Sequence, residues 1–176
     1  VIGTFNGEDN SQLHILWVWI SDSNAIRKGN ILDMEEFKAN IDKSLEEAEK
    51  MAWEQVSGAF ISFNSSSFDV VDNKWIIAIS WEEIGPSDIE RVLDMAKNGM
   101  WLPNREVLKV IPDNFVVDLE EGIKSPIGMS ARKLEVRANI FSISSNVLNN
   151  IKKSIEDVGI EVYDVFPNLI SAPEGV

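Results

Sequence analysis

The sequence predicts an α/β (α+β) fold in which a small α/β domain is inserted into a larger domain. Apolar residues recur at helical spacing in three stretches of the 176-residue chain, around residues 34–54, 87–98 and 147–158. Short apolar or alternating runs, bounded by turn residues, indicate strands between them. The order is strand, strand, helix, strand, then a strand-rich stretch with one helix, then helix and strand, which favours a mixed sheet flanked by helices.

The N-terminal third predicts a hairpin, a long helix and a strand. Residues 1–5 and 13–20 are apolar runs on the two sides of an Asn-Gly turn, and the second run is typical of a strand buried on both faces. Asp33 and Glu36 are spaced as the N-cap and N3 residues of a capping box, which predicts the start of the first helix. A strand is expected to follow over 56–64.

The next stretch predicts two short strands and the second helix. The strands are expected over 68–71 and 75–80, separated by a polar Asp-Asn pair. Ser87 is expected to be the N-cap of the helix, with Glu90 completing a capping box, and Gly99 is expected to end it.

Proline and glycine divide the following stretch. Strands over 106–111 and 115–119 are expected to be interrupted at Pro112. The loop 122–128 contains two glycines and a proline, which predicts a fixed backbone path with a positive φ angle at one of the glycines. An alternating, half-exposed strand is expected over 134–140.

A helix and a strand complete the chain. The third helix is expected to end at Gly159, and a last strand is expected over 160–166. We divide the chain into a discontinuous outer domain, residues 1–66 and 144–176, and an inserted domain, residues 67–143.

Composition excludes several classes of function. The chain has no cysteine, which excludes disulfides, Cys-based zinc sites and a thiol nucleophile. The formal net charge of −13 and the lack of a basic patch argue against nucleic-acid binding. No run approaches the roughly 20 apolar residues of a membrane span, and no secretory signal opens the chain. We therefore expect a soluble, cytoplasmic protein.

No motif for catalysis or cofactor binding is found. The chain has no P-loop and no G-x-G-x-x-G segment, and its single histidine, His14, lies in an apolar run where no Ser-His-Asp triad is predicted. Asp118, Glu120 and Glu121 cluster at the end of a predicted strand. Two interpretations of this acidic cluster are open: a site that binds a cation, or a solvated turn. No catalytic residue, metal ligand or cofactor-binding residue is predicted.

The most specific stretch covers residues 102–135 and reads LPNREVLKVIPDNFVVDLEEGIKSPIGMSARKLE. It begins with Pro and Arg-Glu, has an Ile-Pro strand break and a Val-Asp strand end, and continues with Gly-Ile-x-x-Pro-x-Gly-Met. This pattern resembles the central segment of the FtsA family of bacterial cell-division proteins. The matching residues are Pro103, Arg105, Glu106, Ile111, Pro112, Val117, Asp118, Gly122, Ile123, Pro126, Gly128 and Met129.

The resemblance covers nearly the whole chain and implies an actin-like (ribonuclease H-like) fold. In that family a small domain called 1C is inserted into domain 1A, so the resemblance assigns 67–143 to a 1C-type domain and the flanking parts to 1A. Members bind ATP and magnesium and polymerise into filaments. They tether FtsZ to the cytoplasmic face of the membrane at the division site and recruit later division proteins. The inserted domain is expected to contribute to self-association and recruitment.

Parts of the family pattern are missing from this chain. Residues 1–4 resemble the first phosphate loop but lack its Asp, and Ala131 stands where the family commonly has Gly. The second phosphate loop, the second actin-like half and the membrane-binding helix are expected outside the chain. We therefore expect a fragment or a divergent relative that binds no cofactor by itself and makes no direct membrane contact.

The expected function is non-enzymatic and depends on protein–protein contact. Residues 67–143 carry 13 Asp and Glu against 9 Lys and Arg, and the flanking parts carry 16 against 7, so attraction of a basic partner segment is expected. The alternatives are a PilM-like type IV pilus assembly protein that binds a partner peptide, or an actin-like ATPase. The expected partner-binding residues are one aromatic residue and the acidic cluster: Trp81, Asp118, Glu120 and Glu121. The alternative for Trp81 is that it completes a stripe of core residues.

Overall fold

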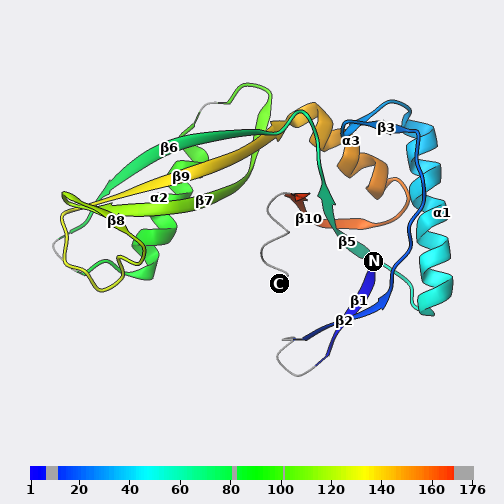
Figure 1. Cartoon of the computed structure of the whole chain (residues 1–176), viewed down its shortest axis with the longest axis horizontal. Helices are drawn as coiled ribbons and strands as arrows, with labels where there is room; N and C mark the ends of the chain where they lie inside the picture. Colours follow the sequence, from blue (N-terminus) through cyan, green and yellow to red (C-terminus); the bar gives the residue numbers. More distant parts are fainter. Residues whose placement is uncertain (7–11, 81–82, 101, 169–176) are drawn as a thin grey trace. The chain divides into compact units, whose positions relative to one another are not determined.

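The chain divides into two compact units, which are described separately. A computed structural model describes residues 1–6, 12–80, 83–100 and 102–168. Unit 1 consists of residues 1–66 and 146–176, and unit 2 of residues 67–145. Trp81 lies outside the described residues, and so does the Asn-Gly turn except for Asn6. Both units contain helices and strands (Figure 1), which agrees with the predicted α/β class.

Helix α1 (Met34–Ala52) starts as the capping pattern predicts. Asp33 is its N-cap, and the Glu36 backbone N–H donates a 3.0 Å hydrogen bond to Asp33 Oδ1. This bond satisfies one of the amides that the first turn leaves free. The helix ends at Trp53, which has a positive φ of 59° and donates its N–H to the Glu49 carbonyl. The predicted end, near residue 54, is therefore correct to within two residues.

Three two-stranded sheets and a second helix complete unit 1. Strands β1 (Ile2–Asn6) and β2 (Gln12–Trp17) form an antiparallel pair, and short strands β3 (Ile26–Arg27) and β4 (Asn30–Ile31) form another. Strands β5 (Gly58–Phe63) and β10 (Glu161–Pro167) are parallel, and helix α3 (Ser145–Glu156) precedes β10. The core lies between α1, α3 and the β5–β10 pair and contains Ile41, Leu45, Ile61, Ile151, Ile155 and Ile160.

The prediction that the second hairpin strand is buried on both faces is wrong. Ile15 is 62% exposed, and Leu16 and Trp17 are also exposed. An apolar run is buried on both faces only if a layer covers each face of its sheet. Among the described residues, β2 pairs only with β1, so neither strand lies inside a larger sheet.

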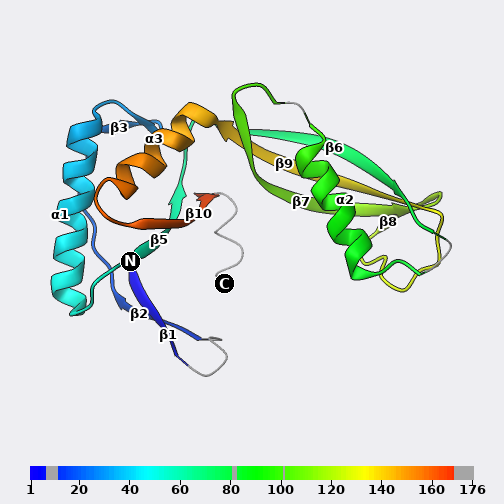
Figure 2. The ribbon, with the colours of Figure 1, turned by 180° about the vertical axis from the view of Figure 1, so that it is seen from behind.

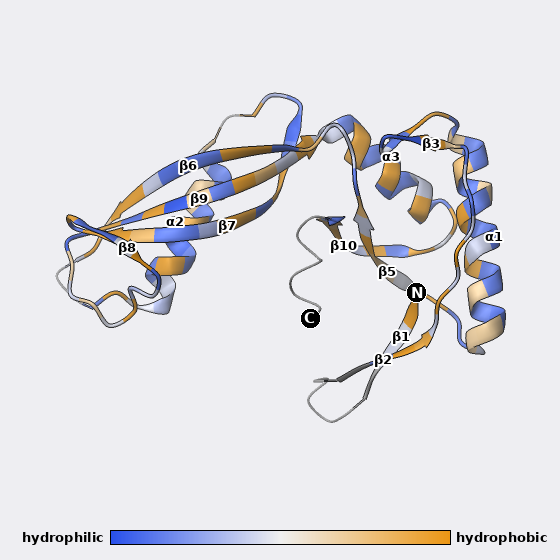
Figure 3. Ribbon diagram, viewed as in Figure 1, coloured by the Kyte–Doolittle hydropathy of each residue, from blue (hydrophilic) through white to orange (hydrophobic). Residues whose placement is uncertain are grey.

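Unit 2 is a four-stranded antiparallel sheet with one helix on one face. The strand order is β6 (Asp69–Ala78), β9 (Lys133–Ser144), β7 (Arg105–Val117) and β8 (Glu120–Ile123). Figure 2 shows helix α2 (Pro86–Asn98) lying across these strands. Hydrophobic and hydrophilic residues alternate along β6, β7 and β9 (Figure 3), as expected for a sheet with one covered face. The core between helix and sheet includes Ile77, Val92, Ala96, Phe115, Leu134 and Val136.

Two predicted strand interruptions in unit 2 are wrong. Strand β6 continues through Asp72 and Asn73, because both residues pair with β9. Strand β7 continues through Pro112, which pairs with Ala138, and the register shifts between Pro112 and Asn114. A bulge of this kind lets a strand accommodate a residue without a backbone N–H. Gly122 and Ile123, expected as the start of the loop, belong to strand β8 (Glu120–Ile123).

The second helix starts two residues earlier than predicted. Gly85, and not Ser87, is the N-cap, and Pro86 occupies the first helical position, where its missing N–H costs nothing. The Gly85 N–H donates a 3.0 Å hydrogen bond to Asp88 Oδ2, so Asp88 takes the place predicted for Glu90. Gly99 ends the helix as predicted, but with a negative φ. A side chain at Gly99 would collide with the Trp75 ring.

Candidate functional site

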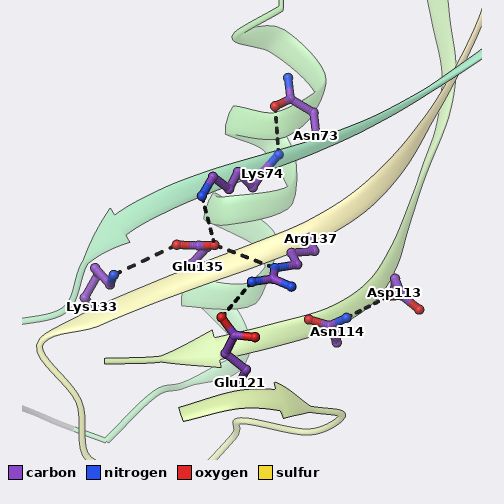
Figure 4. Close-up of polar contacts among 8 residues, drawn as sticks. All are labelled: Asn73, Lys74, Asp113, Asn114, Glu121, Lys133, Glu135 and Arg137. Carbon is purple, nitrogen blue, oxygen red and sulfur yellow. Dashed lines mark hydrogen bonds and ion pairs between the residues drawn. The ribbon is translucent and has the colours of Figure 1, made fainter. Parts of the chain in front are cut away.

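The face of the unit 2 sheet opposite α2 carries a cluster of charged side chains. On β9, Leu134 and Val136 point into the core, so the alternating residues Glu135 and Arg137 lie on the other face. The cross-strand neighbour of Arg137 on β6 is Lys74. Figure 4 shows these side chains together with Glu121 and Lys133.

Glu135 is a nearly buried carboxylate at the centre of this cluster. Its side chain is 8% exposed, and its carboxylate lies 3.9 Å from each of three cationic nitrogens (Figure 4). These are Lys74 Nζ, Lys133 Nζ and Arg137 Nε. A buried charge requires such compensation, because removal from water is costly. The three cations therefore compensate the charge of Glu135. The two lysines, at 3.9 Å from its carboxylate, remain exposed to solvent.

Glu121 extends the cluster onto β8. Arg137 Nη2 donates a 2.8 Å hydrogen bond to Glu121 Oε1, which makes this the shortest ion pair of the cluster. Counting Lys74, Lys133 and Arg137 against Glu121 and Glu135, the five side chains carry a net charge of +1. Glu121 is thus compensated by Arg137 and is not a free acidic group.

Asp118 holds the turn between β7 and β8 to the start of β9. Its Oδ1 accepts hydrogen bonds from the backbone N–H groups of Arg132 (3.1 Å) and Lys133 (2.9 Å). The Asp118 N–H donates to the Lys133 carbonyl at 3.0 Å, and the residue has a φ of 53°. Asp tolerates this left-handed conformation better than most residues. These contacts give Asp118 a structural role in the turn.

The predicted partner-binding residues are thus distributed over two adjacent features. Asp118 lies in the β7–β8 turn, and Glu120 and Glu121 begin strand β8. Glu120 is exposed, and the neighbouring Leu119 is 92% exposed at the tip of the turn. Trp81 lies outside the described residues. The sequence analysis did not single out Glu135, because its burial depends on the neighbouring strands β6 and β7. The position of this carboxylate between two cationic residues, Lys133 and Arg137, is the sequence feature that could have identified it.

The residues that carry the family pattern have structural positions in unit 2. Gly122 and Gly128 have φ angles of 78° and 85°, which confirms the predicted positive φ. The Gly128 N–H donates to the Ile84 carbonyl, and Ile84 N–H donates to the Met129 carbonyl, both at 2.9 Å. Met129 packs against the core. Five further members of the pattern lie beside or within β7, or in the loop after β8: Pro103, Arg105, Glu106, Pro112 and Pro126.

Unit 1 contains an apolar cavity of about 410 Å³ that the sequence did not predict. It lies between α1, β5 and α3, and its lining includes Phe37, Leu45, Ile61 and Ile155. Phosphate oxygens require N–H donors or cations, and this lining is mostly aliphatic and aromatic. The cavity therefore does not suit ATP and magnesium, the cofactors that the family resemblance implies for the full-length protein.

The described residues contain neither a metal-ligand cluster nor a candidate membrane span. Over 1–6, 12–80, 83–100 and 102–168, no three His, Cys, Asp or Glu side chains are grouped so that they could hold a metal ion. In the same residues, no helix is long and apolar enough to cross a membrane. His14 is exposed in β2.

Comparisons with known proteins give matches to unit 2 and to most of the chain. Residues 66–142 match the family model described as the SHS2 domain inserted in FtsA. The chain is 33% identical to the cell division protein FtsA of Buchnera aphidicola subsp. Schizaphis graminum over 164 residues, covering 93% of this chain and 39% of that protein. It is 30% identical to FtsA of Pseudomonas aeruginosa, covering 89% of this chain and 37% of that protein, and 27% identical to FtsA of Escherichia coli K12.

A solved structure is similar at lower identity. The PilM–PilN type IV pilus biogenesis complex matches 82% of this chain and 37% of the matched chain, with a TM-score of 0.47 and 11% identity. The chain spans less than two fifths of the length of the curated relatives named above. Residues 66–142 therefore match the SHS2 domain inserted in FtsA, and the chain is similar over most of its length to part of the FtsA cell-division proteins.

Proposed function

We propose that the chain is an assembly module of an FtsA-type division protein and works by protein–protein contact. The observation that carries this proposal is the SHS2 match over 66–142 within a chain that is similar to FtsA over most of its length. The full-length protein would tether FtsZ, associate with itself into filaments and recruit later division proteins. Its place would be the cytoplasmic face of the membrane at the division site.

The proposal assigns no catalysis to this chain. The ion pairs of unit 2 compensate its buried charge and leave no carboxylate pair poised for proton transfer among the residues that they join. The full-length protein would bind ATP and magnesium through segments that this chain lacks. Titration calorimetry of the whole chain with MgATP should give no saturable heat. A dissociation constant below about 0.1 mM, which corresponds to about −5.5 kcal/mol, would contradict the proposal.

The proposed partner segment is basic and contacts the β7–β8 end of unit 2. Glu120 is exposed there, beside the exposed Leu119, and offers both charge and apolar area. The chain carries a net charge of −13, which attracts a basic segment at long range. Trp81 is proposed as an aromatic contact of the same partner.

A binding titration tests this contact. The whole chain is titrated with the basic cytoplasmic segment of a division membrane protein at low and at high salt. Binding should weaken clearly as salt rises, because exposed charges are screened. Glu120→Lys should weaken binding at low salt, and Glu90→Lys, on the exposed side of α2, is the matched control with the same change of charge. Equal effects of the two substitutions would contradict a contact at the β7–β8 end and would leave only general attraction by net charge.

A further inference from the structure

The outer edge of the unit 2 sheet is a long strand with a self-complementary sequence. Strand β6 covers ten residues, Asp69–Ala78, and β9 is its only strand partner among the described residues. Figure 1 shows it along one side of the sheet. Exposed edges of this length invite pairing with a further strand.

The backbone groups that face away from β9 belong to the even-numbered residues of β6. The Ile79 N–H donates to the Arg132 carbonyl, and this pair continues the register of the β6–β9 ladder. The backbone N–H and C=O groups of the odd-numbered residues of β6 therefore point toward β9. The Ala78 carbonyl instead accepts from Arg91 Nη2, and the Lys74 N–H donates to Asn73 Oδ1. An added strand would therefore bond to the peptide groups of Val70, Asp72, Lys74 and Ile76.

We propose that β6 pairs with β6 of a second copy of this chain, antiparallel and centred on Asn73. In this register Asp72 lies opposite Lys74 of the second copy, and Lys74 lies opposite its Asp72. Val70 lies opposite Ile76 on either side of the charged pairs. All four residues share the sheet face opposite α2, because Trp75 and Ile77 point into the core beneath that helix.

Side-chain chemistry selects this register over its neighbours. A shift to a centre at Asp72 or at Lys74 places two like charges opposite each other, which destabilises a cross-strand pair. Centres between two residues would pair inward-facing with outward-facing peptide groups, and the ladder could not form. The exposed fractions of Val70 and Ile76, 48% and 47%, leave apolar area that the pairing would bury.

Asn73 restrains the pairing in the single chain. Its Oδ1 accepts a 2.8 Å hydrogen bond from the Lys74 N–H, one of the groups that the second copy requires. Figure 4 shows this contact at the edge of the sheet. The side chain must rotate away before the edges join, so the dimer is weak, with a dissociation constant of about 1 µM to 1 mM. This inference concerns self-association through one edge and does not depend on the cell-division proposal.

Sedimentation velocity of the whole chain over a concentration series tests the proposal with charge-reversed variants. The wild type should dimerise as concentration rises. Asp72→Lys and Lys74→Asp should each weaken dimerisation by about tenfold or more, because each turns both opposite-charge pairs into like-charge pairs. An equimolar mixture of the two variants should dimerise again, because lysines of one then face aspartates of the other. A wild type that stays monomeric, or a mixture that stays monomeric, would overturn the proposal.

Cross-linking tests the register independently, since the chain has no cysteine. Asn73→Cys places two sulfurs across the twofold axis at a pair without ladder hydrogen bonds, whose Cα separation of about 4.5 Å suits a disulfide. Asp69→Cys is the control, because the two sulfurs would be about 27 Å apart along the strand. Oxidation should yield dimers of the first variant in preference to the second. Equal yields would overturn the register. Asn73→Thr, which lacks the amide oxygen, should dimerise more tightly than the wild type.

Discussion

The guanidinium of Arg105 donates two hydrogen bonds to Ser142, from Nε to the Ser142 Oγ and from Nη2 to the Ser142 carbonyl, both 3.1 Å long. The same Nη2 donates to the Ser67 carbonyl at 2.9 Å. Arg105 begins β7, Ser142 lies near the end of β9, and Ser67 is the first residue of unit 2. One side chain thus joins the entry of the unit to the two central strands of its sheet.

Replacement of Arg105 by Met should destabilise unit 2 by about 2–3 kcal/mol. Ser142 is fully buried, so loss of the guanidinium leaves polar groups without partners, and hydrogen bonds from a charged donor are the stronger kind. Urea denaturation measures the change. Arg91→Met is the matched control: Arg91 is half exposed and bonds to the Ala78 carbonyl and Asp88, so a loss below about 1 kcal/mol is expected. Equal losses in the two variants would contradict the special role of Arg105.

Asp118 should tolerate Asn but not Ala. Asn keeps an acceptor oxygen for the Arg132 and Lys133 N–H groups and also tolerates a φ of 53°. Ala loses both advantages, so we expect a loss of about 2 kcal/mol for Asp118→Ala and of less than about 1 kcal/mol for Asp118→Asn. Thermal or urea melts provide the measurement. Two variants with the stability of the wild type would show that the turn does not need this carboxylate.

Glycine substitutions in unit 2 should separate backbone strain from side-chain collision. At Gly128, with a φ of 85°, a methyl group meets nothing within 4 Å, so Gly128→Ala should cost about 1 kcal/mol through conformation alone. The same reasoning applies to Gly122. At Gly99 the φ is negative, but a methyl group would collide with the Trp75 ring and lie 2.6 Å from the Met95 carbonyl. Gly99→Ala should therefore destabilise more than Gly128→Ala, and the reverse order in urea melts would contradict the packing around Trp75.

The Lys38–Asp157 ion pair should make the stability of unit 1 depend on pH at both extremes. Asp157 Oδ2 lies 2.8 Å from Lys38 Nζ, and this contact lowers the pKa of Asp157 and raises the pKa of Lys38. A lowered carboxyl pKa stabilises the fold above the ordinary Asp value of about 3.9 and loses that effect as pH falls through the folded value. A raised lysine pKa stabilises the fold below its ordinary value, about 10.4, and the effect disappears as pH rises further.

Comparison with Asp157→Asn isolates this effect. The stability difference between the wild type and the variant, measured by urea denaturation, should be constant near neutral pH and shrink in acid below the ordinary Asp pKa. The carboxyl carbon of Asp157, followed by NMR, should titrate below that value. A titration at or above it would show that the ion pair does not persist in solution.

Local chemistry made several elements predictable. The Asp33–Glu36 spacing identified the start of α1, and positive φ at Gly122 and Gly128 followed from the composition of their loop. Errors arose where distant residues decide. Pro112 alone suggests a broken strand, but the ladder with β9 continues past it through a bulge. Asp72 and Asn73 favour a turn in isolation, whereas ten paired residues hold β6 extended.

The candidate site was less predictable than the fold. The acidic residues 118, 120 and 121 are adjacent in sequence, but Asp118 serves the backbone and Glu121 serves Arg137, sixteen residues away. Burial of Glu135 likewise depends on neighbours from β6 and β7, which its own strand pattern does not reveal. Only the spatial neighbours of a carboxylate show whether its charge is paired with a cation, as at Glu121, or is exposed to solvent, as at Glu120.

Replacement of the SHS2 domain in a relative tests the central claim, that unit 2 acts as a division-type assembly domain. In Escherichia coli cells depleted of their own FtsA, a chimera that carries residues 67–145 in place of the resident SHS2 domain is expressed, and cell length is measured. We expect shorter cells than in the depleted strain, and no rescue by a chimera with Arg105→Met. Filamentous cells with the stably expressed, unsubstituted chimera, or equal rescue by the Arg105→Met chimera, would contradict this claim.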